Sequence, residues 1–196
     1  MIRAFVAIEL GASLRQNIGQ LQSQIRESLG RAAPHVHLQW VRPESIHLTL
    51  KFLGNIEDGQ VEPVNRALAS AVEGWARFSV ELKGLDVFPD IRAPRVLWLG
   101  FSEPMEPLIR LAGSVGEALN PLGFPPEGKP FRPHLTLARI KERSREVGKA
   151  LAESRLPQHP FRPGTLDVHG VSLMKSELKP SGAVYTRLHH VSLSGA

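Results

Sequence analysis

The feature that most constrains the fold of this chain is an internal repeat built around the tetrapeptide His-Leu-Thr-Leu. The tetrapeptide begins at His47 and again at His134, 87 positions further on. With four threonines in 196 residues, a given histidine is followed two places on by threonine only about 2% of the time. The chain holds eight histidines, so two such matches with the same leucines need a structural reason.

The segments around the two tetrapeptides follow one order. In each half an alternating strand, a helix with apolar residues three and four apart, the HLTL strand, a second helix and a further strand are predicted, and a last strand closes the chain. Gly30 is expected to end the first helix. The expected helices are 12–30, 57–76, 104–123 and 143–156, and the expected strands are 1–10, 47–54, 78–89, 94–103, 131–140, 165–177 and 183–195.

Two copies are too few for a solenoid, so the repeat predicts two related lobes that face each other. A chain of 196 residues can bury a core of its own, and we expect residues 1–196 to form a single two-lobed domain. The hydrophobic fraction of 42% is that of an ordinary soluble globular protein.

The amino-acid composition excludes some kinds of site and favours others. The absence of cysteine excludes disulfides, thiolate zinc sites and cysteine nucleophiles. A net charge of +5 favours anionic partners such as phosphates. No apolar run approaches the roughly 20 residues that cross a bilayer, so we expect a cytoplasmic protein without membrane contact.

The repeated tetrapeptide would present polar side chains to one face of a sheet. Residues two apart on a strand share a face, so His47 lies with Thr49, and His134 with Thr136. The leucines would pack on the other face, and Phe52 is expected there too, in the core. Two facing lobes would then aim two imidazoles and two hydroxyls at one cleft.

This set of groups suits the cleavage of a phosphodiester. In-line attack needs a base on the side of the nucleophile and an acid on the side of the leaving group, and histidine serves either role near neutral pH. Threonine hydroxyls donate hydrogen bonds to phosphate oxygens. Arg132 and Arg139, close to His134, would add positive charge. Simple alternation puts Arg139 on the opposite face, so its participation requires a bulge or a strand end near Ala138, or a long side chain that curls around an edge.

Three other interpretations remain open at this point. A single His-X-Thr on a strand is most often a structural histidine, which the duplication argues against. A metal could bind His47 with His134, or His35 with His37, although threonine is a poor ligand and no carboxylate cluster adjoins them. The basic charge would also suit a module that binds RNA ends without turning them over.

With these residues in view, the chain resembles the 2H phosphoesterase superfamily, which is defined by two His-X-Thr-X motifs. It is most similar to the bacterial and archaeal RNA 2′,3′-cyclic phosphodiesterases, historically called 2′-5′ RNA ligases. The resemblance spans nearly the whole chain, and neither motif departs from the family pattern. The stretches that carry it are RAFVAI (3–8), HLTLKFLG (47–54), RVLWLG (95–100), FRPHLTLAR (131–139) and SELKPSGAVYTRL (176–188).

The resemblance implies an α+β fold with two pseudo-symmetric lobes, whose antiparallel sheets flank a central cleft and whose helices lie outside. It implies hydrolysis of an RNA 2′,3′-cyclic phosphate end to a 2′-phosphomonoester, without metal, cofactor or obligate protein partner. His47 would donate the proton and His134 accept one, with Thr49, Thr136, Arg139 and Arg132 binding substrate. Some members join RNA ends by reversing this reaction, and others act on different cyclic or linear nucleotides.

Overall fold

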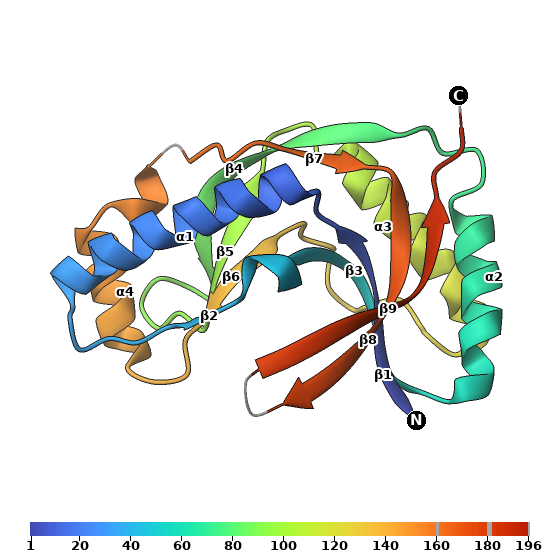
Figure 1. Cartoon of the computed structure of the whole chain (residues 1–196), viewed down its shortest axis with the longest axis horizontal. Coiled ribbons are helices and arrows are strands. Elements are labelled where there is room, and N and C mark those ends of the chain that lie inside the picture. The colour runs from blue at the N-terminus through green and yellow to red at the C-terminus, as the bar shows by residue number, and fades with distance from the viewer. Residues whose placement is uncertain (160, 180–181, 196) are drawn as a thin grey trace.

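The computed structural model describes residues 1–159, 161–179 and 182–195 (Figure 1). Pro180 and Ser181, in the 176–188 stretch, lie outside the described residues. The fold is α+β, as the resemblance implies, and the main elements follow the predicted order. The helices are α1 (Ala12–Ala32), α2 (Val61–Ala71), α3 (Glu106–Leu119) and α4 (Ser144–Glu153). The strands are β1 (Ile2–Glu9), β2 (Gln39–Trp40), β3 (His47–Ile56), β4 (Phe78–Phe88), β5 (Val96–Phe101), β6 (Leu135–Arg139), β7 (Thr165–Val168), β8 (Gly170–Lys179) and β9 (Gly182–Ser192).

The strands form one antiparallel sheet in the order β7-β4-β5-β6-β3-β1-β8-β9, and β2 adds to β6. The two sheets expected from the sequence are therefore joined, through β3 and β6. The predicted strand 165–177 is in fact two strands, because β7 pairs with β4 whereas β8 pairs with β1. Only His169 separates β7 from β8, so a sheet that carries them near opposite ends has to curl.

Gly170, the first residue of β8, meets a clear steric requirement. Gly170 begins β8 directly beside β9, and a Cβ at this position would lie 2.3 Å from the carbonyl oxygen of Val191. Only glycine allows the two backbones to approach this closely. The glycine that reads as part of a continuous strand in the sequence therefore marks the crossing from one half of the sheet to the other.

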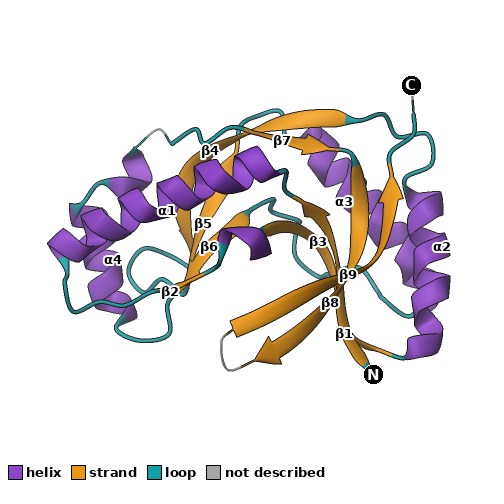
Figure 2. Cartoon of the chain, viewed as in Figure 1, coloured by secondary structure: helices purple, strands orange, loops and turns teal. Residues whose placement is uncertain are grey.

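The helices lie outside the sheet in two pairs (Figures 1 and 2). α1 lies with α4 and α2 with α3, so each pair takes one helix from each copy of the repeat. The predicted apolar face of α1 is buried, but α1 continues past Gly30 to Ala32, where the N–H of Ala33 bonds to the carbonyl of Leu29. No helix within the described ranges is long and apolar enough to span a membrane.

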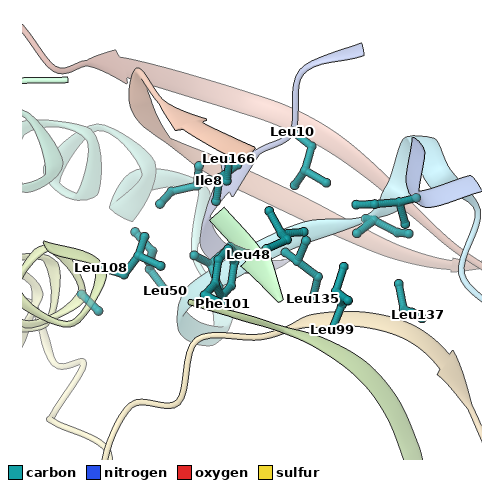
Figure 3. Packing of buried hydrophobic residues seen from close by; sticks show 14 of the residues in the cluster. Ile8, Leu10, Leu48, Leu50, Leu99, Phe101, Leu108, Leu135, Leu137 and Leu166 are labelled. Carbon is teal, nitrogen blue, oxygen red and sulfur yellow. The ribbon is translucent and has the colours of Figure 1, made fainter. Parts of the chain in front are cut away.

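The core is built mainly from the leucine faces of the two repeats (Figure 3). Leu48 of β3 and Leu135 of β6 lie together in it, both fully buried. Leucines of β5 and α3 surround them, with Leu99 and Leu108 also fully buried. Burial of a leucine side chain contributes about 1.5–3 kcal/mol, so the HLTL leucines hold the strands while leaving the opposite face free for chemistry.

Candidate functional site

The two HLTL strands lie side by side in the middle of the sheet. β3 and β6 are antiparallel, and Leu48 lies opposite Leu135, its equivalent in the second copy. A pairing of equivalent residues is what an approximate twofold axis between the strands requires. One further step of this register sets each histidine beside the threonine of the other motif, with Cβ atoms about 5 Å apart. The neighbours are His47 with Thr136, and Thr49 with His134. We call the side of the sheet that carries these four side chains the histidine face.

β3 has a β-bulge at the end of its motif. The register with β1 skips Leu50, which is the extra residue. A bulge reverses the alternation of side chains, so Lys51 turns towards the core and Phe52 towards the histidine face. The prediction that Phe52 lies in the core is therefore wrong, since it is 63% exposed and its ring lies 6.2 Å from that of Phe5. Lys51 is buried, and its ammonium donates to the carbonyl of Pro125 at 2.5 Å.

β6 has the same bulge at the equivalent residue. The register with β5 skips Leu137, so Ala138 turns into the core and Arg139 lies on the histidine face, exposed. A bulge near Ala138, one of the ways considered for Arg139 to reach the site, is thus present. The positive charge of Arg139 is among the influences that lower the pKa of His47. Phe52 and Arg139 occupy matching positions in the two copies.

His47 is held in one orientation by its neighbours. Its Nδ1 donates to the carbonyl oxygen of Ser45 at 2.8 Å, at the end of the 3₁₀ turn Pro43–Ser45. Phe5 stacks on the imidazole with ring centroids 4.7 Å apart, and the edge of Tyr185 meets it at 5.0 Å. Because Nδ1 carries the hydrogen in this bond, Nε2 is the nitrogen left for proton transfer.

His134 is held in the same way. Its Nδ1 donates to the carbonyl oxygen of Arg132 at 2.8 Å, again the residue two places before the histidine. Phe88 and Trp98 meet the ring edge-on at 5.0 Å and 5.9 Å. The guanidinium of Arg132 lies over the Phe88 ring at 5.4 Å. The backbone of Arg132 therefore orients His134, while its side chain lies beside the same aromatic group.

The two histidines differ in the residue that flanks them on the outer strand. Glu9 of β1 lies opposite His47. Leu99 lies opposite Leu135, so one step further the same register puts Gly100 opposite His134. A carboxylate therefore adjoins the first histidine where the second has only a glycine. This is one of the charge differences between the two copies of the motif.

The environment of His47 acts on its protonation in both directions. Burial is the largest influence and lowers the pKa of His47. The hydrogen bond to Ser45 and the negative charge of Glu9 raise the pKa, and the charges of Arg139 and His134 lower it further, with a net downward shift. In the free protein His47 consequently gives up its proton more readily than an ordinary histidine.

His35, a member of the second histidine pair considered as a metal site, contacts α4. The Nε2 of His35 lies 2.7 Å from a carboxylate oxygen of Glu146 on α4, in an exposed hydrogen bond. Within residues 1–159, 161–179 and 182–195, no three histidine, aspartate or glutamate side chains come together in a way that could hold a metal ion. His35 is thus engaged in a contact between the α1–β2 connection and α4.

The aromatic and acidic groups around the histidines were not singled out from the sequence. Phe5 and Glu9 are four apart on β1 and share a face with Ala7, so alternation alone could have placed them together. Tyr185 is the sole tyrosine of the chain. Its position beside His47 depends on the pairing of β8 with both β1 and β9, which no local pattern reveals.

Known proteins are similar in sequence to this chain over most or all of its length. A Methanothermobacter thermautotrophicus protein named RNA 2′,3′-cyclic phosphodiesterase is 33% identical over 94% of this chain and 95% of its own length. An Aquifex aeolicus protein of the same name is 32% identical over 100% of this chain and 99% of its own length.

Solved structures share the fold. The crystal structure of TT0787 of Thermus thermophilus has a TM-score of 0.79 and 30% identity, with 98% of both chains covered. E. coli LigT complexed with 3′-AMP has a TM-score of 0.74 at 24% identity, again with 98% of both chains covered. Residues 13–98 and 99–185 each match the family described as LigT like Phosphoesterase, so the family pattern occurs once in each copy of the repeat. The chain belongs to the LigT-like phosphoesterase family.

Proposed function

We propose that the protein hydrolyses the 2′,3′-cyclic phosphate at an RNA end to a 2′-phosphomonoester, as a single two-lobed domain. The observation that carries the proposal is the pair of imidazoles, one on β3 and one directly before β6, each with Nδ1 bonded to a backbone carbonyl so that Nε2 is the nitrogen left for proton transfer. Two oriented histidines are the groups that an in-line displacement at phosphorus needs. The names of the relatives support the choice of substrate.

In the proposed reaction His134 accepts a proton from water through Nε2 as the water oxygen attacks phosphorus. The bond between phosphorus and the 3′-oxygen breaks, and His47 donates its Nε2 proton to that oxygen. Thr49 and Thr136 donate hydrogen bonds to the non-bridging oxygens. Arg139, with Arg132 further out, balances the charge that develops on the phosphoryl group. The two histidines carry out both proton transfers, and neither metal nor cofactor takes part.

The charge asymmetry supports this division of roles. A carboxylate stabilises a neighbouring imidazolium, and Glu9 adjoins His47, whereas Gly100 adjoins His134. The carboxylate of Glu9 is held in place by the hydroxyl of Ser172 at 2.7 Å. A substrate phosphate is also an anion and favours the protonated form of His47 once it is bound. The carboxylate and the bound phosphate both favour the protonated form that His47 needs as the proton donor.

The aromatic side chains on the histidine face would bind the nucleoside part of the substrate. Phe52 is exposed beside Phe5, and Tyr185 lies against His47, so flat apolar surfaces adjoin the proposed phosphate position. Base stacking on such rings is tolerant of sequence. Ligation of RNA ends would be the reverse displacement, with a 5′-hydroxyl in place of water.

The proposal is tested by incubating the protein with a nucleoside 2′,3′-cyclic phosphate in EDTA and identifying the product by ³¹P NMR. Ring opening to the 2′-phosphate alone is the expected result. Tight binding without turnover would show instead a module that captures RNA ends. Turnover that disappears in EDTA and returns with added metal would contradict the two-histidine reaction.

The Glu9→Gln variant should shift one limb of the pH–rate profile. The carboxylate raises the pKa of His47, so its loss lowers that pKa further. A proton donor works only below its pKa, and the alkaline limb of kcat/KM should therefore move to lower pH. The measurement is kcat/KM against pH for the wild type and the variant with the same cyclic phosphate.

The control for this experiment is Glu146→Gln, which removes one negative charge at α4, where the carboxylate pairs with His35 and Arg143. Its profile should match the wild type. If Glu9→Gln moves the acidic limb instead, His47 is the base and the two roles are reversed. If it moves neither limb, Glu9 does not act on the proton donor.

A further inference from the structure

A buried amide on α1 bonds to the bulge that turns Arg139 towards the histidine face. Gln22 is only 4% exposed, and its Nε2 donates to the carbonyl of Leu137 at 3.0 Å and to that of Val41 at 2.8 Å. The N–H of Val41 donates to the same Leu137 carbonyl at 2.9 Å. One side chain thus ties α1 to the backbone of β6 and to the segment after β2.

One of these two carbonyls belongs to Leu137, the residue that determines on which face of the sheet Arg139 lies. Leu137 is the extra residue of the bulge, and without it simple alternation would put Arg139 on the core face. Residues at a bulge leave the regular ladder, so their polar groups need partners from elsewhere. Without Gln22 the Leu137 carbonyl would keep only the N–H of Val41, and the Val41 carbonyl would lose the donor that Gln22 gives it.

We propose that Gln22 is a positioning residue, which holds the bulge at Leu137 and thereby keeps the Arg139 guanidinium on the histidine face. The inference rests on the proposed function, in which Arg139 binds the substrate phosphate. Gln22 itself contacts neither substrate nor histidine and acts through the backbone of β6. The glutamine side chain can reach two carbonyls at once because α1 packs directly against this part of the sheet.

A double-mutant cycle between Gln22→Met and Arg139→Ala tests the inference, because methionine keeps the length of glutamine and removes the amide. Two quantities are measured for each folded variant: the affinity for inorganic phosphate by calorimetry, and kcat/KM for a 2′,3′-cyclic phosphate. Gln22→Met should weaken both by about tenfold, as small misplacements of a binding group do. In the Arg139→Ala background the same substitution should add less than about twofold.

The matched control is Ile25→Val, which trims a fully buried side chain on the same helix and leaves the amide bonds intact. It should lower stability but leave phosphate affinity and kcat/KM unchanged. If Gln22→Met does not fold, Gln22→Asn replaces it, since its amide is one methylene shorter and cannot span both carbonyls.

The outcomes separate this inference from the proposed function. Losses that add in the double variant, or a Gln22 variant with wild-type phosphate affinity, would overturn the positioning role. Wild-type phosphate affinity in Arg139→Ala would remove Arg139 from the site and the role of Gln22 with it. A wild-type protein that binds phosphate with a non-additive cycle but opens no cyclic phosphate would overturn the proposed reaction alone.

Discussion

Replacing His47 or His134 with alanine is expected to lower turnover of a nucleoside 2′,3′-cyclic phosphate by about 10²–10⁴, the usual contribution of one acid–base group. Each imidazole is fixed through Nδ1 to a backbone carbonyl and offers Nε2 for proton transfer. Alanine removes the imidazole, and with it the nitrogen that transfers the proton. Steady-state kinetics at the pH optimum measures the loss, and each variant should also lose one limb of the bell-shaped profile.

The double alanine variant should lose less than the product of the two single losses, because two groups that serve one displacement are not independent. The control is His189→Ala. His189 is exposed on β9, opposite the buried Leu173 and away from the histidine face. This variant should keep wild-type turnover and show the same thermal unfolding as the site variants. If either His47→Ala or His134→Ala turned over substrate at the wild-type rate, paired acid–base catalysis would be excluded.

The order of the elements was predictable because each half of the chain repeats one pattern. Periodicity located the helices, and the leucine face of α1 is buried as expected. The predicted ends of the helices and strands were less accurate than their order. Gly30 lies inside α1, because a glycine in an exposed last turn costs only about 1 kcal/mol and the helix has packing to offset it. The division of the predicted strand 165–177 into β7 and β8 could not be predicted locally, since it depends on β7 pairing with β4 and β8 pairing with β1.

The site was predictable as far as residues two apart on a strand share a face. The neighbouring bulges limited the prediction, because a bulge depends on the register of the partner strand and not on local sequence. At β6 a bulge was one of the ways considered for Arg139 to reach the site, whereas at β3 nothing in the sequence suggested one and Phe52 was assigned to the core. Glu9 was missed because it comes into the site from a strand 38 positions away, opposite His47.

The second large effect is expected at Arg139. Arg139→Lys should lower kcat/KM by more than about tenfold, near 1.4 kcal/mol, and Arg139→Ala should lower it further. The bulge at Leu137 puts the guanidinium on the histidine face, where its planar pair of donors matches two phosphate oxygens. Lysine keeps the charge but offers a single point of contact, so the substitution isolates the two-pronged geometry.

Arg139→Ala should also change the pH dependence, in the direction opposite to Glu9→Gln. The charge of Arg139 lowers the pKa of His47, so its removal raises that pKa and moves the alkaline limb of kcat/KM to higher pH. Arg95→Ala is the matched control, because Arg95 is exposed nearby and its guanidinium donates to the carbonyl of Lys141. Wild-type kinetics for both Arg139 variants would leave Arg132 to neutralise the phosphate. A tenfold loss without any movement of the limb would mean that Arg139 binds the substrate at a distance from His47.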